Sequence, residues 1–212
     1  MHEQIAANKR TSVLLVAGAF VIPPLEPTGS GRGPAGSIVY ALLLISGVRA
    51  LGERRLTRMV LMPVAILTLA VELGTWVVPM PEPLVEGMGL LSLLLFLAVV
   101  LGQTLRSGPI TYHRLNGAVA AYLLFGFIFA YAYSLVALVR PGAFSGPVSP
   151  TDGPRAFFYF SFVTLTTVGY GDITAVNSVA RSMALLEGLT GQLYPAILIA
   201  RLVSMHVGTR RE

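Results

Sequence analysis

Long apolar segments with almost no charged residues constrain this chain more than any other feature. Only 12% of its 212 residues are charged and 54% are apolar, whereas soluble domains have about 25% charged residues. A membrane-spanning helix needs about 20 mainly apolar residues. Five segments meet or approach that length, at 37–52, 59–78, 88–105, 115–139 and 179–207. We expect three prolines, at positions 79, 81 and 83, to end the second of these segments.

A further apolar stretch, 11–22, lies nearer the first residue and is shorter. With Lys9 and Arg10 before it, the stretch resembles a signal peptide, but residues 25–30 do not form a small-residue cleavage site. A helix that begins near Gln4 is long enough to span if both basic side chains reach the membrane surface. We therefore favour a retained first span and about six transmembrane helices in all.

The basic residues predict how these helices are oriented. Of the 15 Lys and Arg residues, eleven fall on or near one side of the six-span arrangement and four fall on the other. The larger group is Lys9, Arg10, Arg49, Arg54, Arg55, Arg58, Arg106, Arg114, Arg201, Arg210 and Arg211; the smaller is Arg32, Arg140, Arg155 and Arg181. The positive-inside rule places the larger group, and both termini, in the cytoplasm. Topology, with anionic lipid as a further partner, explains the net charge of +5 without nucleic-acid binding.

A short apolar segment and a glycine-containing loop lie between the last two spans. Residues 154–166 are too few to cross a membrane but suit a re-entrant helix. Asp152 is a candidate N-cap, and Pro154 fits the first turn. The carboxyl end of such a helix would point into the membrane, where its negative dipole end favours a cation.

The loop that follows has the sequence Thr-Leu-Thr-Thr-Val-Gly-Tyr-Gly-Asp at 164–172. Carbonyl oxygens of successive residues can face one axis only if the backbone alternates between right- and left-handed regions. Gly169 and Gly171 enter the left-handed region without a Cβ penalty, so Val168 and Tyr170 can turn their side chains away from the axis. Thr167 can add its hydroxyl oxygen. The simpler alternative is a glycine-rich turn after a helix, but the full nonapeptide between two apolar segments favours the first interpretation.

Over 115–207 the sequence resembles a tetrameric potassium channel, in which the pentapeptide Thr-Val-Gly-Tyr-Gly is the selectivity filter. The resemblance implies an outer helix, a pore helix, a filter and an inner helix, and four identical subunits around one axis. It implies that K⁺ ions are the permeant ligand and that no other cofactor is needed. The implied filter residues are Thr167, Val168, Gly169, Tyr170 and Gly171, of which the first four coordinate K⁺, with support from Thr164, Thr166, Asp172 and Tyr159.

The position four residues before the filter threonine departs from part of the family. Some members have a glutamate there that braces the filter aspartate, but this chain has Val163. We expect the Tyr159 hydroxyl to reach Asp172 instead. The inactivation behaviour of the filter therefore does not carry over from those members.

The inner-helix segment contains several candidate hinge, gate and sensor residues. Gly191 lies where the family commonly has a hinge glycine, although a small residue also permits close helix contact. Pro195 removes a backbone hydrogen bond and favours a kink. Glu187 is a possible sensor, and a satisfied structural carboxyl is the alternative. Helical spacing suggests an apolar gate from Ile199, Val203 and Val207.

The chain is expected to divide into a four-helix membrane domain at 1–108 and a pore domain at 109–212. The first resembles a voltage-sensor-like domain without charges, because the segment 88–105 contains no basic residue. One charge moved through 100 mV is worth about 2.3 kcal/mol, and steep gating needs several per subunit. We therefore predict that the fourth span does not sense voltage.

These observations predict an all-α membrane protein with a re-entrant pore helix and a selectivity-filter loop. The predicted function is passive, potassium-selective conduction in a plasma membrane or bacterial inner membrane. A weakly selective cation channel, and a non-conducting or auxiliary subunit or scaffold, are the alternatives. An enzyme is not expected, because the chain has no paired carboxylates with a nucleophile, no histidines at metal-binding spacing and no phosphate loop.

Overall fold

The structure is a computed structural model that describes residues 55–74, 80–104, 112–149 and 154–208. The expected spans at 11–22 and 37–52, and the proposed N-cap Asp152, lie outside the described residues. The described elements are almost all helices, and they are α3 (Arg55–Gly74), α4 (Glu82–Thr104), α5 (Tyr112–Val139), α6 (Pro154–Leu165) and α7 (Ser178–Gly208), with the short strands β1 (Phe144–Ser145) and β2 (Thr174–Ala175).

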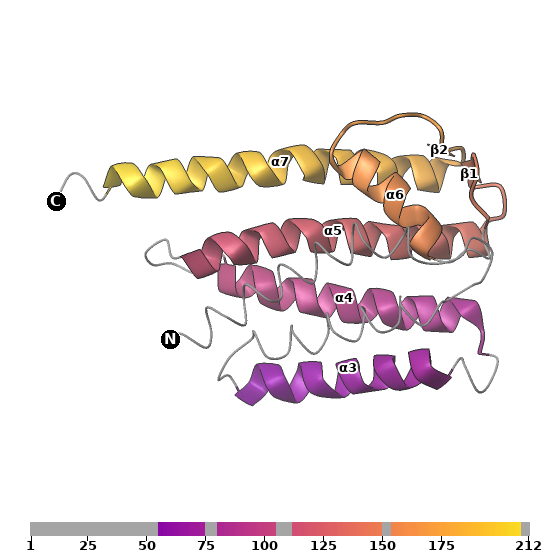
Figure 1. Cartoon of the computed structure of the whole chain (residues 1–212), viewed down its shortest axis with the longest axis horizontal. Helices are drawn as coiled ribbons and strands as arrows, with labels where there is room; N and C mark the ends of the chain where they lie inside the picture. Colours follow the sequence, from indigo (N-terminus) through magenta and orange to yellow (C-terminus); the bar gives the residue numbers. More distant parts are fainter. Residues whose placement is uncertain (1–54, 75–79, 105–111, 150–153, 209–212) are drawn as a thin grey trace.

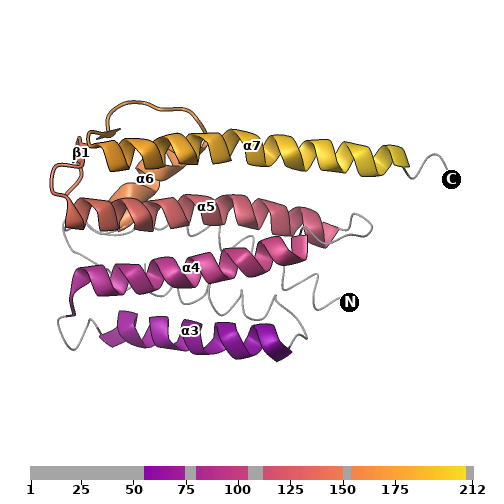
Figure 2. The same cartoon turned by 180° about the vertical axis from the view of Figure 1, so that it is seen from behind.

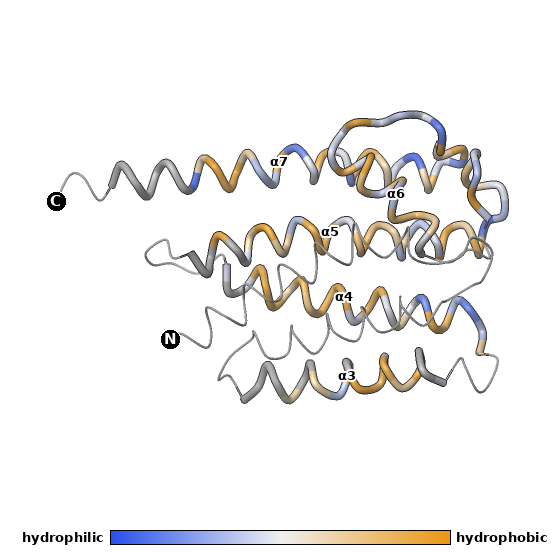
Figure 3. The backbone as a smooth tube through the Cα atoms, in the orientation of Figure 1, coloured by the Kyte–Doolittle hydropathy of each residue, from blue (hydrophilic) through white to orange (hydrophobic). Residues whose placement is uncertain are grey.

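Helices α3, α4, α5 and α7 lie roughly side by side and alternate in direction (Figure 1). The shorter α6 lies obliquely against α5 and α7, at the end that also holds β1 and β2, as the opposite view confirms (Figure 2). Three helical segments are long and apolar enough to cross a membrane, and these are Glu82–Gly102, Gly117–Val139 and Ser178–Arg201. Hydrophobic colouring predominates along α4 and α5 (Figure 3). The chain is thus a mostly helical, multi-pass membrane protein.

Helix α4 begins six residues before the apolar segment that predicted it, at Glu82 rather than residue 88. The expectation that Pro83 helps to end the preceding helix is wrong, because Pro83 lies in the first turn of α4. The Pro81 carbonyl accepts from the Leu84 and Val85 amides at 3.0 and 3.4 Å. The first helical amides have no partner within the helix, so a proline there costs no hydrogen bond.

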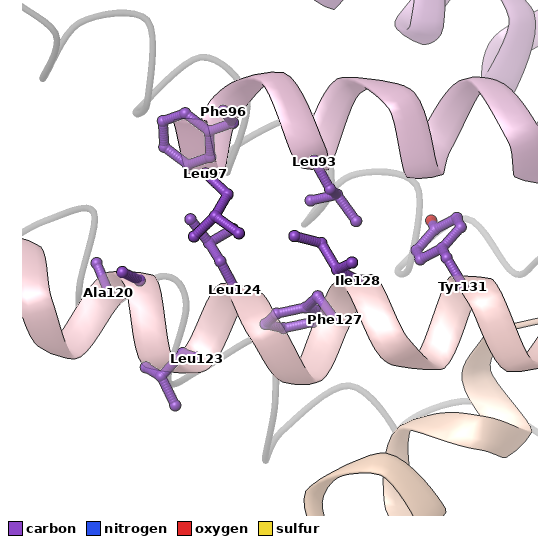
Figure 4. Packing of buried hydrophobic residues seen from close by; sticks show 10 residues of the cluster. Leu93, Phe96, Leu97, Ala120, Leu123, Leu124, Phe127, Ile128 and Tyr131 are labelled. Carbon is purple, nitrogen blue, oxygen red and sulfur yellow. The ribbon is translucent and has the colours of Figure 1, made fainter. Parts of the chain in front are cut away.

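The largest apolar core lies between α4 and α5. Leu93 and Leu97 of α4 point toward Leu124 and Ile128 of α5, and all four are buried (Figure 4). Neighbouring residues of the same cluster complete it, namely Phe96, Ala120, Ala121, Leu123, Phe127 and Tyr131. Lipid is as apolar as leucine, so van der Waals contact rather than exclusion from water stabilises this helix pair.

A second cluster, rich in aromatic rings, packs α6 against α5. Tyr133 of α5 and Phe157 of α6 are fully buried, and Phe144 of β1 contacts both of them and Phe160. Ring centroids in this group lie 4.8–6.4 Å apart, in mainly tilted and edge-on arrangements that suit aromatic quadrupoles. This cluster fixes α6 relative to the C-terminal part of α5.

A two-residue strand pair, which the sequence patterns did not predict, connects the segments before α6 and after the loop 166–173. Phe144 pairs with Ala175 and Ser145 with Thr174, in antiparallel register. Close by, Gly146 approaches the Asp172 carbonyl so closely that a Cβ would overlap it. The two ends of the α6 and loop segment are therefore held together.

Candidate functional site

The candidate site is the loop that follows α6. Helix α6 ends at Leu165, one residue before the predicted end, and its 12 residues match the short helix expected there. The Thr166 amide donates to the Phe162 carbonyl at 3.0 Å, and the Thr167 amide donates to the Thr164 carbonyl at 2.9 Å. The chain thus leaves α6 through a final hydrogen-bonded turn.

Alternate residues of the loop adopt left-handed backbone conformations. The φ angles are +60° at Thr167, +57° at Gly169 and +80° at Gly171. The sequence predicted this for the two glycines but not for Thr167, where a β-branched residue with positive φ is a true outlier. Such outliers cost about 1–3 kcal/mol and persist only where the surroundings impose them.

The carboxyl end of α6 imposes part of this conformation through Val163. Its carbonyl oxygen accepts from the Val168 amide at 2.9 Å and from the Gly169 amide at 3.3 Å. The hydroxyls of Thr164 and Thr166 donate to carbonyls one turn earlier in the helix, each at 2.7 Å. The hydroxyls of these two threonines, which were predicted to support the filter, therefore bond to α6 rather than to the loop.

Tyr159 and Asp172 lie together at the far end of the loop. The Tyr159 hydroxyl interacts with the Asp172 carboxylate, and its role as a brace for the loop stays a prediction. The Tyr159 and Tyr170 rings stack with centroids 6.4 Å apart and an angle of 3° between their planes. Tyr170 thus lies beside Tyr159 of α6, but it is exposed in the single chain, as are the other residues of 166–172.

The carboxyl end of α6 is enclosed by α5 and α7. The Tyr122 hydroxyl of α5 donates to the Leu165 carbonyl at 3.3 Å. On the other side, a Cβ at Gly191 would overlap the Leu165 carbonyl oxygen. Close contact between α7 and the end of α6 is therefore sufficient to explain why residue 191 is glycine. A hinge role for Gly191 stays a prediction.

Glu187 of α7 is fully buried and joins three helices. The Tyr133 hydroxyl of α5 donates to Glu187 Oε2 at 2.6 Å. Ser161 Oγ of α6 lies 2.5 Å from Glu187 Oε1 and 2.7 Å from the Gly126 carbonyl oxygen of α5. Hydrogen bonds to Tyr133 and Ser161 therefore support a structural role for the Glu187 carboxyl, and a sensor role stays a prediction.

Sequence patterns singled out Glu187 but missed its partners Tyr133 and Ser161. Both are polar residues inside apolar helices, which was the only available signal. Gly126 was missed as well, and a Cβ there would come within 2.7 Å of the Phe162 ring. Small size at Gly126 lets α6 approach α5 closely enough for Ser161 to reach its partners.

The predicted gate residues lie in the second half of α7. Pro195 is within the helix, which continues to Gly208. Ile199 is 60% exposed in the single chain. The side chains of Val203 and Val207 lie outside the described part, so the gate stays a prediction.

The part of the chain that contains this site is similar to known proteins. Residues 118–207 match the family model described as "Ion channel". A protein named "Two pore potassium channel c", from Oryza sativa subsp. japonica, is 34% identical over 88 residues, which are 40% of this chain and 19% of that protein. "Protein LctB" of Bacillus caldotenax is 44% identical over 45 residues, which are 21% of this chain and 33% of that protein.

The chain thus matches about a fifth and a third of the lengths of these two relatives. No solved structure matches it significantly. The matched region extends from α5 to the end of α7 and contains α6 and the loop. Through this region the chain is similar to ion channels, and one of the relatives that match it is named a potassium channel.

Proposed function

We propose that this chain is the subunit of a tetrameric, potassium-selective channel, with α6 as the pore helix and Thr167–Gly171 as the filter. The observation that carries this proposal is the alternation of left-handed residues at Thr167, Gly169 and Gly171. Alternation of this kind lets successive carbonyls face one side of the loop, and rings of such carbonyls replace the water shell of K⁺.

The exposure of the loop supports assembly around an axis. Thr167–Gly171 are all exposed in the single chain, although they follow a helix that is largely buried. Large apolar residues on α7 are exposed as well, including Leu185, Leu189 and Leu193. One loop supplies only a quarter of each oxygen ring, so four copies are required. Cross-linking of the purified protein should yield species up to a tetramer, and a limit at the dimer would contradict this stoichiometry.

The orientation follows from charge. Helix directions place Arg55 and Arg114 near one end of the bundle, and Arg140 and Arg181 near the end that carries the loop. In the six-span arrangement expected from the sequence, the rest of the larger group belongs to the same side as Arg55 and Arg114. The positive-inside rule then puts the filter mouth outside and both termini in the cytoplasm.

Labelling of an introduced cysteine tests this orientation. Pro147 is exposed and lies in the segment that follows β1, at the same end as the loop. The chain has no cysteine of its own, so Pro147→Cys provides a single thiol. We expect an impermeant thiol reagent to reach it from outside the cell, and labelling only from inside would reverse the orientation.

Potassium flux tests the function itself. Liposomes that contain the purified protein alone should release K⁺ down its gradient and retain Na⁺. Equal passage of both ions would indicate a weakly selective pore. No flux of K⁺ or of Na⁺ would indicate a non-conducting subunit or scaffold. Either result would overturn the proposal.

A further inference from the structure

Glu187 Oε1 and the Gly126 carbonyl oxygen compete for the one hydroxyl hydrogen of Ser161. Tyr133 donates its one hydroxyl hydrogen to Glu187 Oε2. Ser161 Oγ lies within hydrogen-bonding distance of two oxygen atoms, Glu187 Oε1 and the Gly126 carbonyl. A serine hydroxyl has a single hydrogen to donate, so it cannot donate to both.

Only one arrangement of hydrogens satisfies every short contact. If Glu187 carries a proton on Oε1, it donates to Ser161 Oγ, and Ser161 donates to the Gly126 carbonyl. If Glu187 is ionised, Ser161 must donate to the carboxylate, and the 2.7 Å contact with the Gly126 carbonyl is left without a hydrogen. The contacts therefore fit a carboxylic acid rather than a carboxylate.

The burial of Glu187 also favours the protonated, neutral form of its carboxyl group. Glu187 has no solvent exposure in the single chain, so neighbouring subunits cannot reach it. Among the described residues Glu187 makes its side-chain hydrogen bonds to Tyr133 and Ser161, and neither of these carries a positive charge. A carboxylate buried without a cation is strongly disfavoured, and such groups usually become neutral.

The position of this cluster connects it to the loop. Ser161 lies in α6 two residues before Val163, whose carbonyl holds the Val168 and Gly169 amides. A chain of hydrogen bonds from α7 through Ser161 to α5 therefore fixes α6 directly behind the loop. Movement of α6 would move Val163 and the residues that bond to it.

We propose that Glu187 is a positioning residue, held as a neutral carboxylic acid that bridges α7, α6 and α5 through Ser161 and Tyr133 and so sets the position of the filter. The assignment of the neutral state is independent of function. The consequence for the filter rests on the proposed channel function.

Infrared spectroscopy tests the neutral state in the full chain reconstituted in lipid. A protonated carboxylic acid has a carbonyl band at higher frequency than a carboxylate. We expect such a band at neutral pH, lost in Glu187→Gln and retained in Glu86→Gln, which changes the other buried acid of the described residues. A spectrum unchanged by Glu187→Gln would overturn the neutral assignment, whatever the protein conducts.

Flux measurements test the positioning role. Glu187→Gln keeps a donor for Ser161 and an acceptor for Tyr133, so its K⁺ over Na⁺ selectivity should match the unchanged protein. Ser161→Ala breaks the bridge, and we expect a loss of selectivity of about tenfold, the equivalent of one buried hydrogen bond. Ser134→Ala is the matched control, because the Ser134 hydroxyl is buried and has no partner among the described residues.

The outcomes distinguish the positioning role of Glu187 from the proposed channel function. Equal selectivity in Ser161→Ala and Ser134→Ala would overturn the positioning role, as would loss of selectivity in a folded Glu187→Gln. If the unchanged protein passes no K⁺ selectively, the proposed function fails, and the infrared band still decides the state of Glu187. Tyr133→Phe, which removes one hydroxyl and keeps the ring, should also lower selectivity, and its failure to do so would count against the bridge.

Discussion

At the scale of single residues, Gly169 and Gly171 are required for their backbone conformation and not for their small size. Both have positive φ, and a Cβ built on either meets no atom within 4 Å in the single chain. Gly191 is the opposite case, because its helical backbone suits any residue but the Leu165 carbonyl fills the adjacent space. The same residue type therefore serves two different physical purposes around α6.

Replacing Gly169 with alanine tests the conformational requirement. A Cβ in the left-handed region costs about 1–2 kcal/mol, and the loop can avoid this cost by turning its carbonyls. We expect K⁺ selectivity or conduction to be abolished while the tetramer remains intact, measured by ion flux and by size-exclusion chromatography. Gly102→Ala is the control, because Gly102 lies in α4 with open space around it. An unchanged preference for K⁺ over Na⁺ in Gly169→Ala would refute the filter assignment.

Tyr159→Phe tests the contact with Asp172 separately from the ring stack. The variant removes the hydroxyl and keeps the stack on Tyr170. We expect K⁺ over Na⁺ selectivity to fall, by less than in Gly169→Ala, because Tyr159 is exposed in the single chain and only one contact is lost. Tyr159→Leu removes both interactions and should lower selectivity further. If Tyr159→Phe and the unchanged protein have equal selectivity and equal inactivation, the hydroxyl does not brace the loop.

Residue patterns predicted some of this site and not the rest, for physical reasons. A glycine in a known pentapeptide predicts left-handed backbone locally, so Gly169 and Gly171 could be anticipated. Thr167 could not, because its positive φ depends on how Val163 holds the next two amides. Ser161 was missed because its partners lie 26 and 35 positions away, on other helices.

At the scale of elements, α6 is the component on which the site depends. Aromatic rings fix its first half against α5, and Ser161 links its middle to α5 and α7. Its carboxyl end contacts Tyr122 on one side and Gly191 on the other. A short helix is marginally stable alone, so these contacts with longer helices determine where it ends and where the loop begins.

Gly191→Ala tests whether close contact or hinge bending explains this glycine. The added Cβ would overlap a backbone oxygen that cannot rotate away, so α7 must shift from α6. Overpacking of this kind costs about 1–3 kcal/mol, and we expect a lower thermal unfolding temperature in detergent. Gly188→Ala, in the same helix with open space around it, should change that temperature little. If both variants keep the stability of the unchanged protein and only Gly191→Ala alters opening, the hinge explanation is correct.

The long helices were the most predictable elements, and their ends were the least. Apolar length alone located α5 and α7 to within three residues at each end. The start of α4 was misplaced because Glu82, Pro83 and Glu86 look like part of a loop, although all three lie in the first turns of the helix. The β1–β2 pair has only two residues per strand, too few to produce an alternating pattern.

At the scale of the whole molecule, the region that matches the ion-channel family model follows a helix that has no basic residue. Helix α4 precedes the matched region and contains no basic residue. It packs on α5 through an apolar core. A field across the membrane therefore has no basic side chain on α4 to move.

Single-channel recording in a planar bilayer tests the prediction that the channel does not sense voltage through α4. We expect the open probability to change only shallowly over a wide voltage range, because each sensor charge contributes about 2.3 kcal/mol per 100 mV and α4 has no basic residue. A basic residue introduced at Leu94, which is exposed on α4, provides the comparison. A steep dependence in the unchanged protein would show that another segment senses voltage.

The reversal potential with K⁺ on one side of a bilayer and Na⁺ on the other tests the central claim most directly. It reports selectivity without depending on how often the channel opens or on how many molecules insert. For the purified protein alone, we expect a large potential with the sign of K⁺ selectivity, which disappears in Gly169→Ala and persists in Gly102→Ala. A potential near zero for the unchanged, conducting protein would contradict the assignment of Thr167–Gly171 as a potassium filter.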